Sequence, residues 1–279
     1  MTFPHQDAAA VLRRHGIHAR RGLGQNFLDE PQYLERIVEA ADLSKTDTVL
    51  EIGCGLGALT RHLAQAARRV VAVEIDGRLA DIARASLDGF TNAEIVQGDI
   101  LDMATTELGL PEGFVVAANI PYYVTSPILR LLLETEPGPK RIVLTVQKEV
   151  GARLCAGPPN MSLLSVSVQV YGSPRIVFGI PAAAFYPVPN VDSVVVRIDC
   201  YDPPPVSPSL LPALFAAARA GFSQRRKILR NTLSSGLGIS TKDGQALLQA
   251  AGVDFRRRPQ TVSIEEWARI AQVLLDRKS

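Results

Sequence analysis

The chain contains the stretch Thr48-Val49-Leu50-Glu51-Ile52-Gly53-Cys54-Gly55-Leu56-Gly57, in which a short apolar run leads into three alternating glycines. The run is continuous rather than alternating, as is typical of a central parallel strand that is covered on both faces. Glycines after such a strand let the backbone turn tightly and approach a ligand closely. The stretch therefore predicts the first strand and ligand loop of an α/β sheet, although a plain strand–helix turn can show the same pattern.

Further runs with the composition of strands follow, and most of them alternate with amphipathic segments such as Leu59–Ala67 and Arg78–Leu87. These strand candidates are Val70–Ile75, Ala93–Val96, Phe114–Ala118, Ile142–Val146, Arg175–Phe178 and Ser193–Ile198. The alternation predicts a doubly wound α/β sheet. Ser162–Tyr171 has the valine alternation of a strand, but its place between two better strands favours a crossover helix.

The proline-rich stretch Asp202–Pro208 is a stiff break and a natural domain boundary. Beyond it the patterns are helical, over Leu211–Phe222, Arg225–Leu233, Gly244–Ala251 and Ile264–Leu275. Ser263, with Glu265 and Glu266 after it, has the form of a helix start. We expect an α/β domain over residues 1–203, with a basic N-terminal segment, and a small helical domain over 204–279.

Charge is distributed unevenly along the 279 residues, although the net charge is only +2. Up to residue 200 there are 18 Lys and Arg against 22 Asp and Glu, and after it 12 against 6. A basic C-terminal part on an acidic body indicates a polyanionic partner, or simply a solvated helical surface.

The three cysteines, Cys54, Cys155 and Cys200, form neither a CxxC pair nor a disulfide framework, which favours a reducing, cytoplasmic location. The four histidines make no metal-ligand spacing with them, so we expect no metal site. Residues 1–7 lack the apolar core of a signal peptide, and no apolar run approaches the length of a membrane span.

Acidic residues follow the next two strand candidates. Glu74 ends the second one, where a carboxylate can bind both hydroxyls of a ribose. Asp99 follows the third and can accept a hydrogen bond from an adenine amine, with Ile75 and Ile100 as apolar faces for the ring. Because open α/β sheets bind ligands at the carboxyl ends of their strands, Gly53 and Gly55 belong to the same predicted site.

The fourth strand candidate ends in Asn119-Ile120-Pro121-Tyr122. The Asn119 carbonyl and a backbone carbonyl near Pro121 can accept from a planar amine, and Tyr122 can lie against its ring. Such sequences also occur in ordinary turns. No His or Lys stands near this segment for the proton transfer that a nicotinamide enzyme needs, so methyl transfer to an amine fits better.

Together these motifs resemble the ribosomal RNA adenine N6,N6-dimethyltransferase family over nearly the whole chain, most of all its bacterial small-subunit (16S) branch. The matching segments are Gly24–Leu28, Glu51–Gly57, Glu74, Gly98-Asp99, Asn119–Tyr122, Gln147–Val150, Phe185–Ser193 and Phe222–Lys227. The resemblance implies a Rossmann-like methyltransferase domain with a mostly parallel seven-stranded sheet, followed by a small all-helical domain. Tyr123 stands where many members carry Asn.

The resemblance also implies S-adenosylmethionine as cofactor and assigns roles to residues. Asn26, Leu28 and Gly53 would lie at its methionine end, Glu74 at the ribose and Asp99 at the adenine. Asn119 would touch both the cofactor and the target amine. Tyr122 and Phe185 are the candidates to sandwich an unstacked adenine, and the alternative for Phe185 is a core aromatic in a proline-rich loop.

Basic clusters are the candidates for RNA contact. The first comprises Arg225, Arg226, Lys227 and Arg230 at the start of a predicted helix. A second is Arg256–Arg258, and a third, near the N-terminus, comprises Arg13, Arg14, Arg20 and Arg21. Such clusters suit phosphates, but each could also be a solvated or internally paired surface.

The implied activity is dimethylation of N6 on two adjacent adenines in a hairpin near the 3′ end of small-subunit rRNA, by a cytoplasmic monomer acting during subunit biogenesis. The nearest alternative is a large-subunit rRNA dimethyltransferase that confers macrolide resistance, which shares the catalytic motifs. A DNA adenine methyltransferase, a non-catalytic assembly factor and a nicotinamide dehydrogenase are the others.

Overall fold

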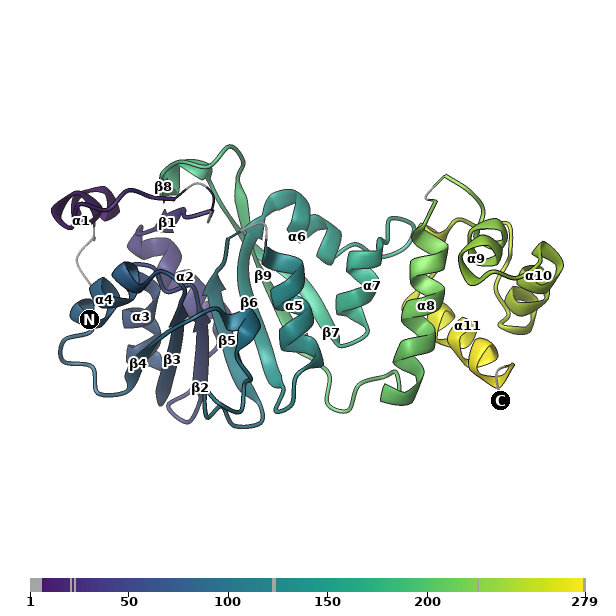
Figure 1. The fold of residues 1–279 in the computed structure, drawn as a ribbon, viewed down its shortest axis with the longest axis horizontal. Coiled ribbons are helices and arrows are strands. Elements are labelled where there is room, and N and C mark those ends of the chain that lie inside the picture. Colours follow the sequence, from purple (N-terminus) through teal and green to yellow (C-terminus); the bar gives the residue numbers. More distant parts are fainter. Residues whose placement is uncertain (1–6, 21, 23, 122–123, 225, 278–279) are drawn as a thin grey trace. The chain divides into compact units, whose positions relative to one another are not determined.

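The computed structural model of the chain describes residues 7–20, 22, 24–121, 124–224 and 226–277 (Figure 1). The chain divides into two compact units, residues 1–151 with 174–200 and residues 152–173 with 201–279. The sequence predicts one boundary, between residues 203 and 204, close to the second crossing. The sequence predicts segment 152–173 in the first domain, but by its contacts this segment belongs with the C-terminal unit.

A seven-stranded sheet forms the centre of the first unit. Its order is β4 (Ala93–Gln97), β3 (Arg69–Glu74), β2 (Thr48–Ile52), β5 (Phe114–Asn119), β6 (Pro139–Gln147), β9 (Ser193–Cys200) and β7 (Gly172–Ile180). The strands from β4 to β6 are parallel to their neighbours, and β9 is antiparallel to β6. The chain moves outward from β2 in one direction and from β5 in the other, so a topological switch point, where α/β sheets bind ligands, lies between them. The predicted fold class is confirmed.

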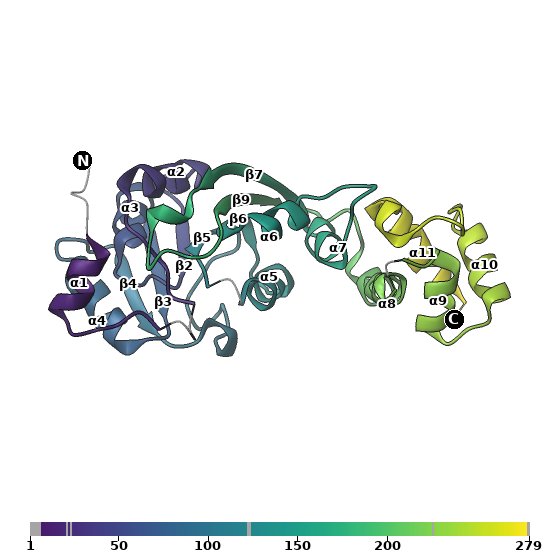
Figure 2. The ribbon, with the colours of Figure 1, turned by 90° about the horizontal axis from the view of Figure 1, so that it is seen from above.

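Helices cover both faces of this sheet (Figure 2). On one face lie the pair α2 (Pro31–Ala41) and α3 (Ala58–Ala66) together with α4 (Gly77–Ser86), and on the other lies α5 (Thr125–Glu134). Ile37 and Leu63 from the first pair are fully buried among strand valines such as Val49 and Val143. The chain continues from β6 into α6 (Lys148–Leu154). The continuous apolar runs of the sequence thus became strands that are buried on both sides.

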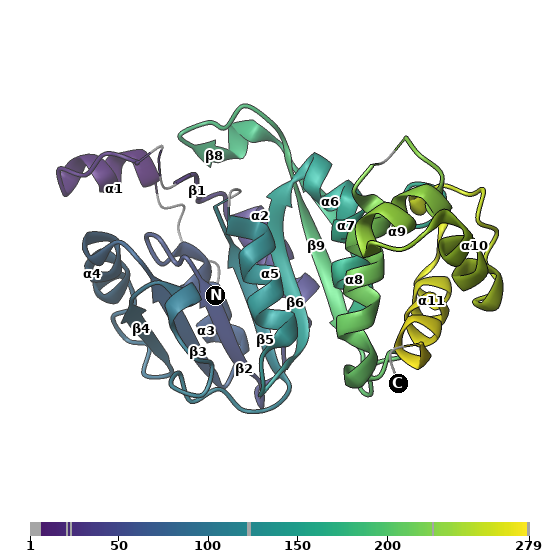
Figure 3. The same ribbon diagram turned by 45° about the vertical axis from the view of Figure 1, so that its right-hand side comes forward.

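A second sheet of only two short strands joins β1 (Phe27–Leu28) to β8 (Phe185–Tyr186), which lie side by side in Figure 3. Phe27 pairs with Tyr186, and Leu28 pairs with Phe185. The α1 helix (Ala8–Arg14) precedes β1, and its Leu12 is buried in one cluster with Phe27. Neither short strand is predicted from the sequence, because two residues are too few to show a period.

The second unit is helical. It comprises α7 (Leu163–Gln169), α8 (Leu211–Phe222), α9 (Leu229–Leu237), α10 (Thr241–Ala250) and α11 (Ile264–Asp276). Its core surrounds Trp267, whose side chain is fully buried among residues of α8, α9 and α10. The predicted helix at Ser162–Tyr171 is confirmed as α7, which a Ser162–Ser165 capping box starts. Ser263 starts α11 in the same way, with Glu266.

One helix of the second unit begins later than predicted. The sequence predicts a helix over Arg225–Leu233, but α9 begins at Leu229. The Leu229 amide donates to the Arg257 carbonyl at 2.7 Å, so a neighbouring loop satisfies the first free amide of the helix. Arg226 and Lys227 consequently lie in the preceding turn.

Within the described part of the chain, no helix is long and apolar enough to cross a membrane. The same residues contain no group of three or more His, Cys, Asp and Glu side chains placed to hold a metal ion.

Candidate cofactor and target-base site

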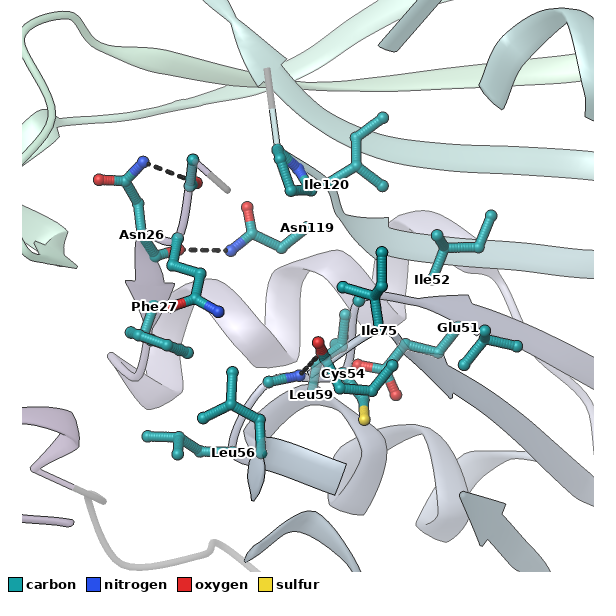
Figure 4. A pocket seen from close by; sticks show the side chains of 18 of the residues that line it. Asn26, Phe27, Glu51, Ile52, Cys54, Leu56, Leu59, Ile75, Asn119 and Ile120 are labelled. Atoms are coloured by element: carbon teal, nitrogen blue, oxygen red, sulfur yellow. Dashed lines mark hydrogen bonds between the residues drawn. The ribbon is translucent and has the colours of Figure 1, made fainter. Parts of the chain in front are cut away.

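A pocket opens where β2, β3 and β5 end (Figure 4). Every one of the nine residues predicted to bind the cofactor lines it: Asn26, Leu28, Gly53, Gly55, Glu74, Ile75, Asp99, Ile100 and Asn119. Pro121 lines it as well. Tyr122 and Tyr123 lie outside the described residues. The pocket thus brings together residues that are up to 95 positions apart in the sequence, since parallel strands end at one edge of the sheet.

The floor of the pocket is the glycine loop between β2 and α3. Gly53, Gly55 and Gly57 have φ angles of +74°, +56° and +80°, which side chains other than glycine rarely adopt. The Phe27 ring packs directly on Gly55, where a Cβ atom would stand 3.1 Å from the ring. The motif Gly24–Leu28 contains Phe27, but the sequence assigns this residue no role of its own, because its packing on Gly55 becomes evident only in the fold.

Glu74 ends β3 with its carboxylate held in place. Its Oε2 accepts from the Gly55 amide at 2.9 Å, and its Oε1 accepts from the Asp76 amide at 3.0 Å. Burial raises the pKa of Glu74, and these two hydrogen bonds oppose that rise. Each oxygen keeps a further acceptor position, so the carboxylate can still bind the two hydroxyls of a ribose.

An apolar slot lies beside Glu74. Ile75 is 51% exposed and Leu101 is 39% exposed, although both are large apolar side chains that line the pocket. Asp99 stands between them in sequence and accepts from the Leu101 amide at 3.0 Å. Exposed apolar walls with an acceptor at their edge suit a flat heterocycle with an amine. Leu101 was missed from the sequence because nothing distinguishes it there from a core leucine.

Asn119, the last residue of β5, faces the N-terminal segment across the pocket. Its Nδ2 donates to the backbone carbonyl of Asn26 at 3.2 Å, and the Asn26 side chain donates to the Gly24 carbonyl at 3.1 Å (Figure 4). The Asn119 amide therefore has its donor end engaged. No described residue donates a hydrogen bond to its carbonyl oxygen, which can accept one from a ligand.

The charge of the pocket is one-sided. Carboxylates from Asp29, Glu74 and Asp99 line it together with the buried carboxyl group of Glu51, and its described lining includes no Lys, Arg or His. Such a wall favours a positively charged ligand. It disfavours the pyrophosphate of a dinucleotide, which the same glycine pattern would otherwise allow.

Phe185 lies elsewhere than the base-sandwich prediction requires. Its side chain is 3% exposed and belongs to the core cluster around α2, and it is absent from the residues that line the pocket. Its strand pairing with Leu28 directs it into that core. In the structure Phe185 is therefore a core residue, and its stacking against a base stays a prediction without structural support.

The basic residues predicted to contact RNA divide into exposed and anchored ones. Arg226 and Lys227 are exposed in the turn before α9, whereas Arg225 lies outside the described residues. Arg230 is half-buried and donates to Asn231 and Gln245. Its guanidinium is therefore less available for a phosphate than the sequence suggests.

The second basic run lies against the first. The amides of Leu229 and Arg230 donate to the carbonyls of Arg257 and Phe255, at 2.7 and 3.2 Å. Arg257 itself is paired with Glu266, but Arg256 and Arg258 are exposed. Four exposed cations, Arg226, Lys227, Arg256 and Arg258, thus come from two adjoining loops of the helical unit, and we call them the basic loop pair.

Comparison with known proteins shows the family to which the chain belongs. Residues 16–276 match the model of a family described as ribosomal RNA adenine dimethylase. The chain belongs to this family. The ribosomal RNA small subunit methyltransferase A of Dehalococcoides mccartyi (strain CBDB1) is 42% identical over 264 residues, which cover 94% of this chain and 91% of that protein. The protein of the same name from Pelotomaculum thermopropionicum is 42% identical over 280 residues, covering 95% of each.

Solved structures of similar proteins extend the comparison to three dimensions. A dimethyladenosine transferase from Plasmodium falciparum superposes with a TM-score of 0.77 at 25% identity, over 90% of this chain and 97% of that one. The 23S rRNA methyltransferase ErmE superposes with a TM-score of 0.73 at 30% identity, over 89% and 99%. A dimethyladenosine transferase and a 23S rRNA methyltransferase therefore share this fold.

Glu51, behind the glycine loop, gives a testable pH dependence. It is 1% exposed, and its burial, with the nearby Glu74 charge, raises its pKa from 4.5 to about 8. Between these values the folded protein holds a proton that the unfolded chain has lost. Stability should therefore fall as pH rises across this window, by about 1.4 kcal/mol per unit, and level off above it. Glu51→Gln should remove this slope and melt higher than the wild type at pH 8.

The control for this prediction is pH 4.5, where both proteins carry a neutral group and should unfold with similar free energies. Urea unfolding across the range measures the difference. Parallel pH profiles of the two proteins would show that Glu51 is ionised in the fold.

Proposed function

We propose that this protein is an S-adenosylmethionine-dependent methyltransferase that dimethylates N6 of two adjacent adenines in a hairpin near the 3′ end of small-subunit rRNA. It acts during small-subunit biogenesis, in the cytoplasm and as a monomer. Family membership supports the reaction class. The observation that carries it is the Asn119 amide, whose donor end is engaged and whose carbonyl remains available at the edge of an acidic pocket.

The residues present fit S-adenosylmethionine. The acidic lining suits a molecule with a positive sulfur and an ammonium group, the exposed Ile75 and Leu101 suit its adenine, and Glu74 suits its ribose. Gly53 and Gly55 let the backbone approach it, and Asn26 and Leu28 stand at the side where its methionine part would lie. When bound, it supplies a methyl group on a positively charged sulfur.

The chain's contribution to the reaction is to hold and polarise the target amine. The adenine N6 lone pair is delocalised into its ring, which makes it a weak nucleophile. A hydrogen bond from N6 to the Asn119 carbonyl favours a pyramidal nitrogen and stabilises the positive charge that develops on it. The backbone near Pro121 offers a second acceptor. No general base is needed, since the cationic product loses its proton to water readily.

The basic loop pair is our candidate for binding the RNA backbone. Arg226, Lys227, Arg256 and Arg258 are exposed. Of the neighbouring acids, Glu266 is paired with Arg257, and the single charge of Asp254, which accepts from the Arg256 amide, is outnumbered by these four cations. The surface therefore keeps an excess of positive charge, which attracts phosphates and makes binding weaken with salt. Arg230, which lies over the Phe255 ring at 5.6 Å, supports this surface from within.

The target distinguishes the proposal from its nearest alternative. The two relatives named as small-subunit methyltransferases are 42% identical to the chain, whereas the large-subunit enzyme ErmE is 30% identical. This difference favours small-subunit rRNA. Methyl transfer to isolated small subunits, with large-subunit RNA in parallel, tests the choice.

Thermal unfolding tests the cofactor separately. S-adenosylmethionine at a hundred times its dissociation constant should stabilise the protein by about 2.7 kcal/mol, and NAD at the same concentration should not. The acidic pocket is the reason for the difference. A rise in the unfolding temperature with NAD and none with S-adenosylmethionine would instead support a nicotinamide dehydrogenase.

A further inference from the structure

The catalytic amide of Asn119 is oriented by a backbone atom outside the strand ends. An asparagine amide has two ends of similar size, one that donates and one that accepts. Turned by 180°, the Asn119 side chain would point its NH2 at an incoming amine and its carbonyl at the Asn26 carbonyl. Both contacts would be repulsive. The 3.2 Å hydrogen bond to the Asn26 carbonyl therefore selects the orientation that can accept from adenine N6.

The segment that carries this carbonyl, Gly24–Leu28, is itself fixed by contacts around the cofactor pocket. Phe27 packs on Gly55 of the glycine loop, and Leu28 pairs with Phe185 across the two-stranded sheet. All five of its residues line the pocket. A ligand that fills the pocket thus touches the same segment that orients the target amide.

Two further contacts hold the ends of the N-terminal region. The Asp29 carboxylate accepts from the Ala8 amide at 2.6 Å, which ties α1 to the residue after β1. Arg20 lies 3.5 Å from the Asp76 carboxylate, just beyond the Glu74 strand end. Segment Gly24–Leu28 therefore lies outside any helix, and contacts of Arg20 before it and of Asp29 after it hold its two ends.

We propose that segment Gly24–Leu28 is a positioning element that couples the two ligand sites: its Asn26 carbonyl sets the Asn119 amide, so that the acceptor for the target amine is formed only when the segment is seated over the cofactor pocket. This inference rests on the proposed methyl transfer. Its functional consequence is that any change in the seating of the segment alters the cofactor site and the acceptor for the target amine together.

Asn119→Asp tests the coupling, because it keeps an acceptor for the amine but replaces the donor with an oxygen. At pH 8 this carboxylate should repel the Asn26 carbonyl and loosen the segment. We expect the affinity for S-adenosylhomocysteine to fall about tenfold, because one hydrogen bond is removed and a repulsion takes its place. We also expect faster amide exchange in residues 24–28. Added negative charge alone would act in the opposite direction, strengthening the binding of an ammonium-bearing ligand.

Lowering the pH supplies the decisive readout. Once protonated, the substituted carboxyl can donate to the Asn26 carbonyl again, so the affinity of the variant should recover toward that of the wild type. The carboxyl groups of Glu51, Glu74, Asp99 and Asp29 also line the pocket. They are common to both proteins, so the variant-to-wild-type ratio at each pH isolates the substituted group.

Asn190→Asp, at an exposed asparagine in the β8–β9 loop, is the matched control and should bind S-adenosylhomocysteine like the wild type. Thermal unfolding shows whether each variant is folded. Wild-type affinity and exchange in Asn119→Asp at pH 8 would overturn the coupling. So would a loss of affinity that low pH does not reverse. Absence of methyl transfer by the wild-type protein would instead refute the proposed function and leave the binding result standing.

Discussion

Asn119→Ala is expected to lower the rate of methyl transfer by about 10²–10³-fold, as is typical when one preorganised polar group facing a developing charge is removed. The alanine leaves the adenine amine without its side-chain acceptor at the end of β5. The Asn26 carbonyl also loses its hydrogen-bond donor, so cofactor affinity should fall as well. Single-turnover rates at saturating S-adenosylmethionine separate the two effects, since saturation removes the binding contribution.

The control is Asn190→Ala, which removes an exposed amide from the β8–β9 loop and should transfer at the wild-type rate. If Asn119→Ala reached a single-turnover rate close to that of the wild type, the amide would not hold the target amine. The acceptor would then have to be sought in the backbone near Pro121.

Reversing the charge of the basic loop pair should have the second large effect. Arg226→Glu combined with Lys227→Glu is expected to weaken RNA binding by more than tenfold, because each cation that neutralises a phosphate also releases a counterion. The dependence of log K on log salt should become shallower by about 0.9 for each phosphate that the variant no longer neutralises. Cofactor affinity should stay unchanged. Binding of an rRNA hairpin across a salt series measures both quantities.

Lys45→Glu is the matched control for this surface. It makes the same charge change per residue at an exposed side chain before β2, at the opposite end of that strand from the pocket. Its effect on RNA binding and on the salt slope should be small. If the double reversal left both quantities at their wild-type values, Arg226 and Lys227 would be solvated side chains that do not bind RNA, and RNA contact would have to come from other basic residues, such as those of the N-terminal cluster.

Sequence pattern predicted the seven strands of the large sheet because each candidate contains adjacent β-branched residues within a short segment. The observed strand boundaries differ from the predicted ones where backbone pairing, rather than composition, determines the end of a strand. For example, β6 begins at Pro139, before the apolar run at Ile142. By propensity alone, the alternating valines of α7 indicate a strand. The position of this segment between two strands of the sheet favoured a helix instead. The strands β1 and β8 and the start of α9 depend on partners far away in sequence, which no local pattern reveals.

The candidate site was predicted in a similar way. Residues at strand ends, such as Glu74, Asp99 and Asn119, could be placed because a parallel sheet brings its strand ends together. Phe27 and Leu101 could not, since their roles arise from packing and exposure. Phe185 shows the limit of a motif position, which suggested a stacking ring, whereas strand pairing buries this side chain in the core and its stacking role stays a prediction.

Transfer of a labelled methyl group from S-adenosylmethionine tests the central claim most directly. The substrates are unmodified small ribosomal subunits and, in parallel, unmodified large-subunit RNA, with nucleoside mass spectrometry of the products. Dimethyladenosine in the small-subunit RNA alone is the predicted result. Product only in the large-subunit RNA would move the protein to the resistance branch of its family, and no product in either would contradict the enzymatic account itself.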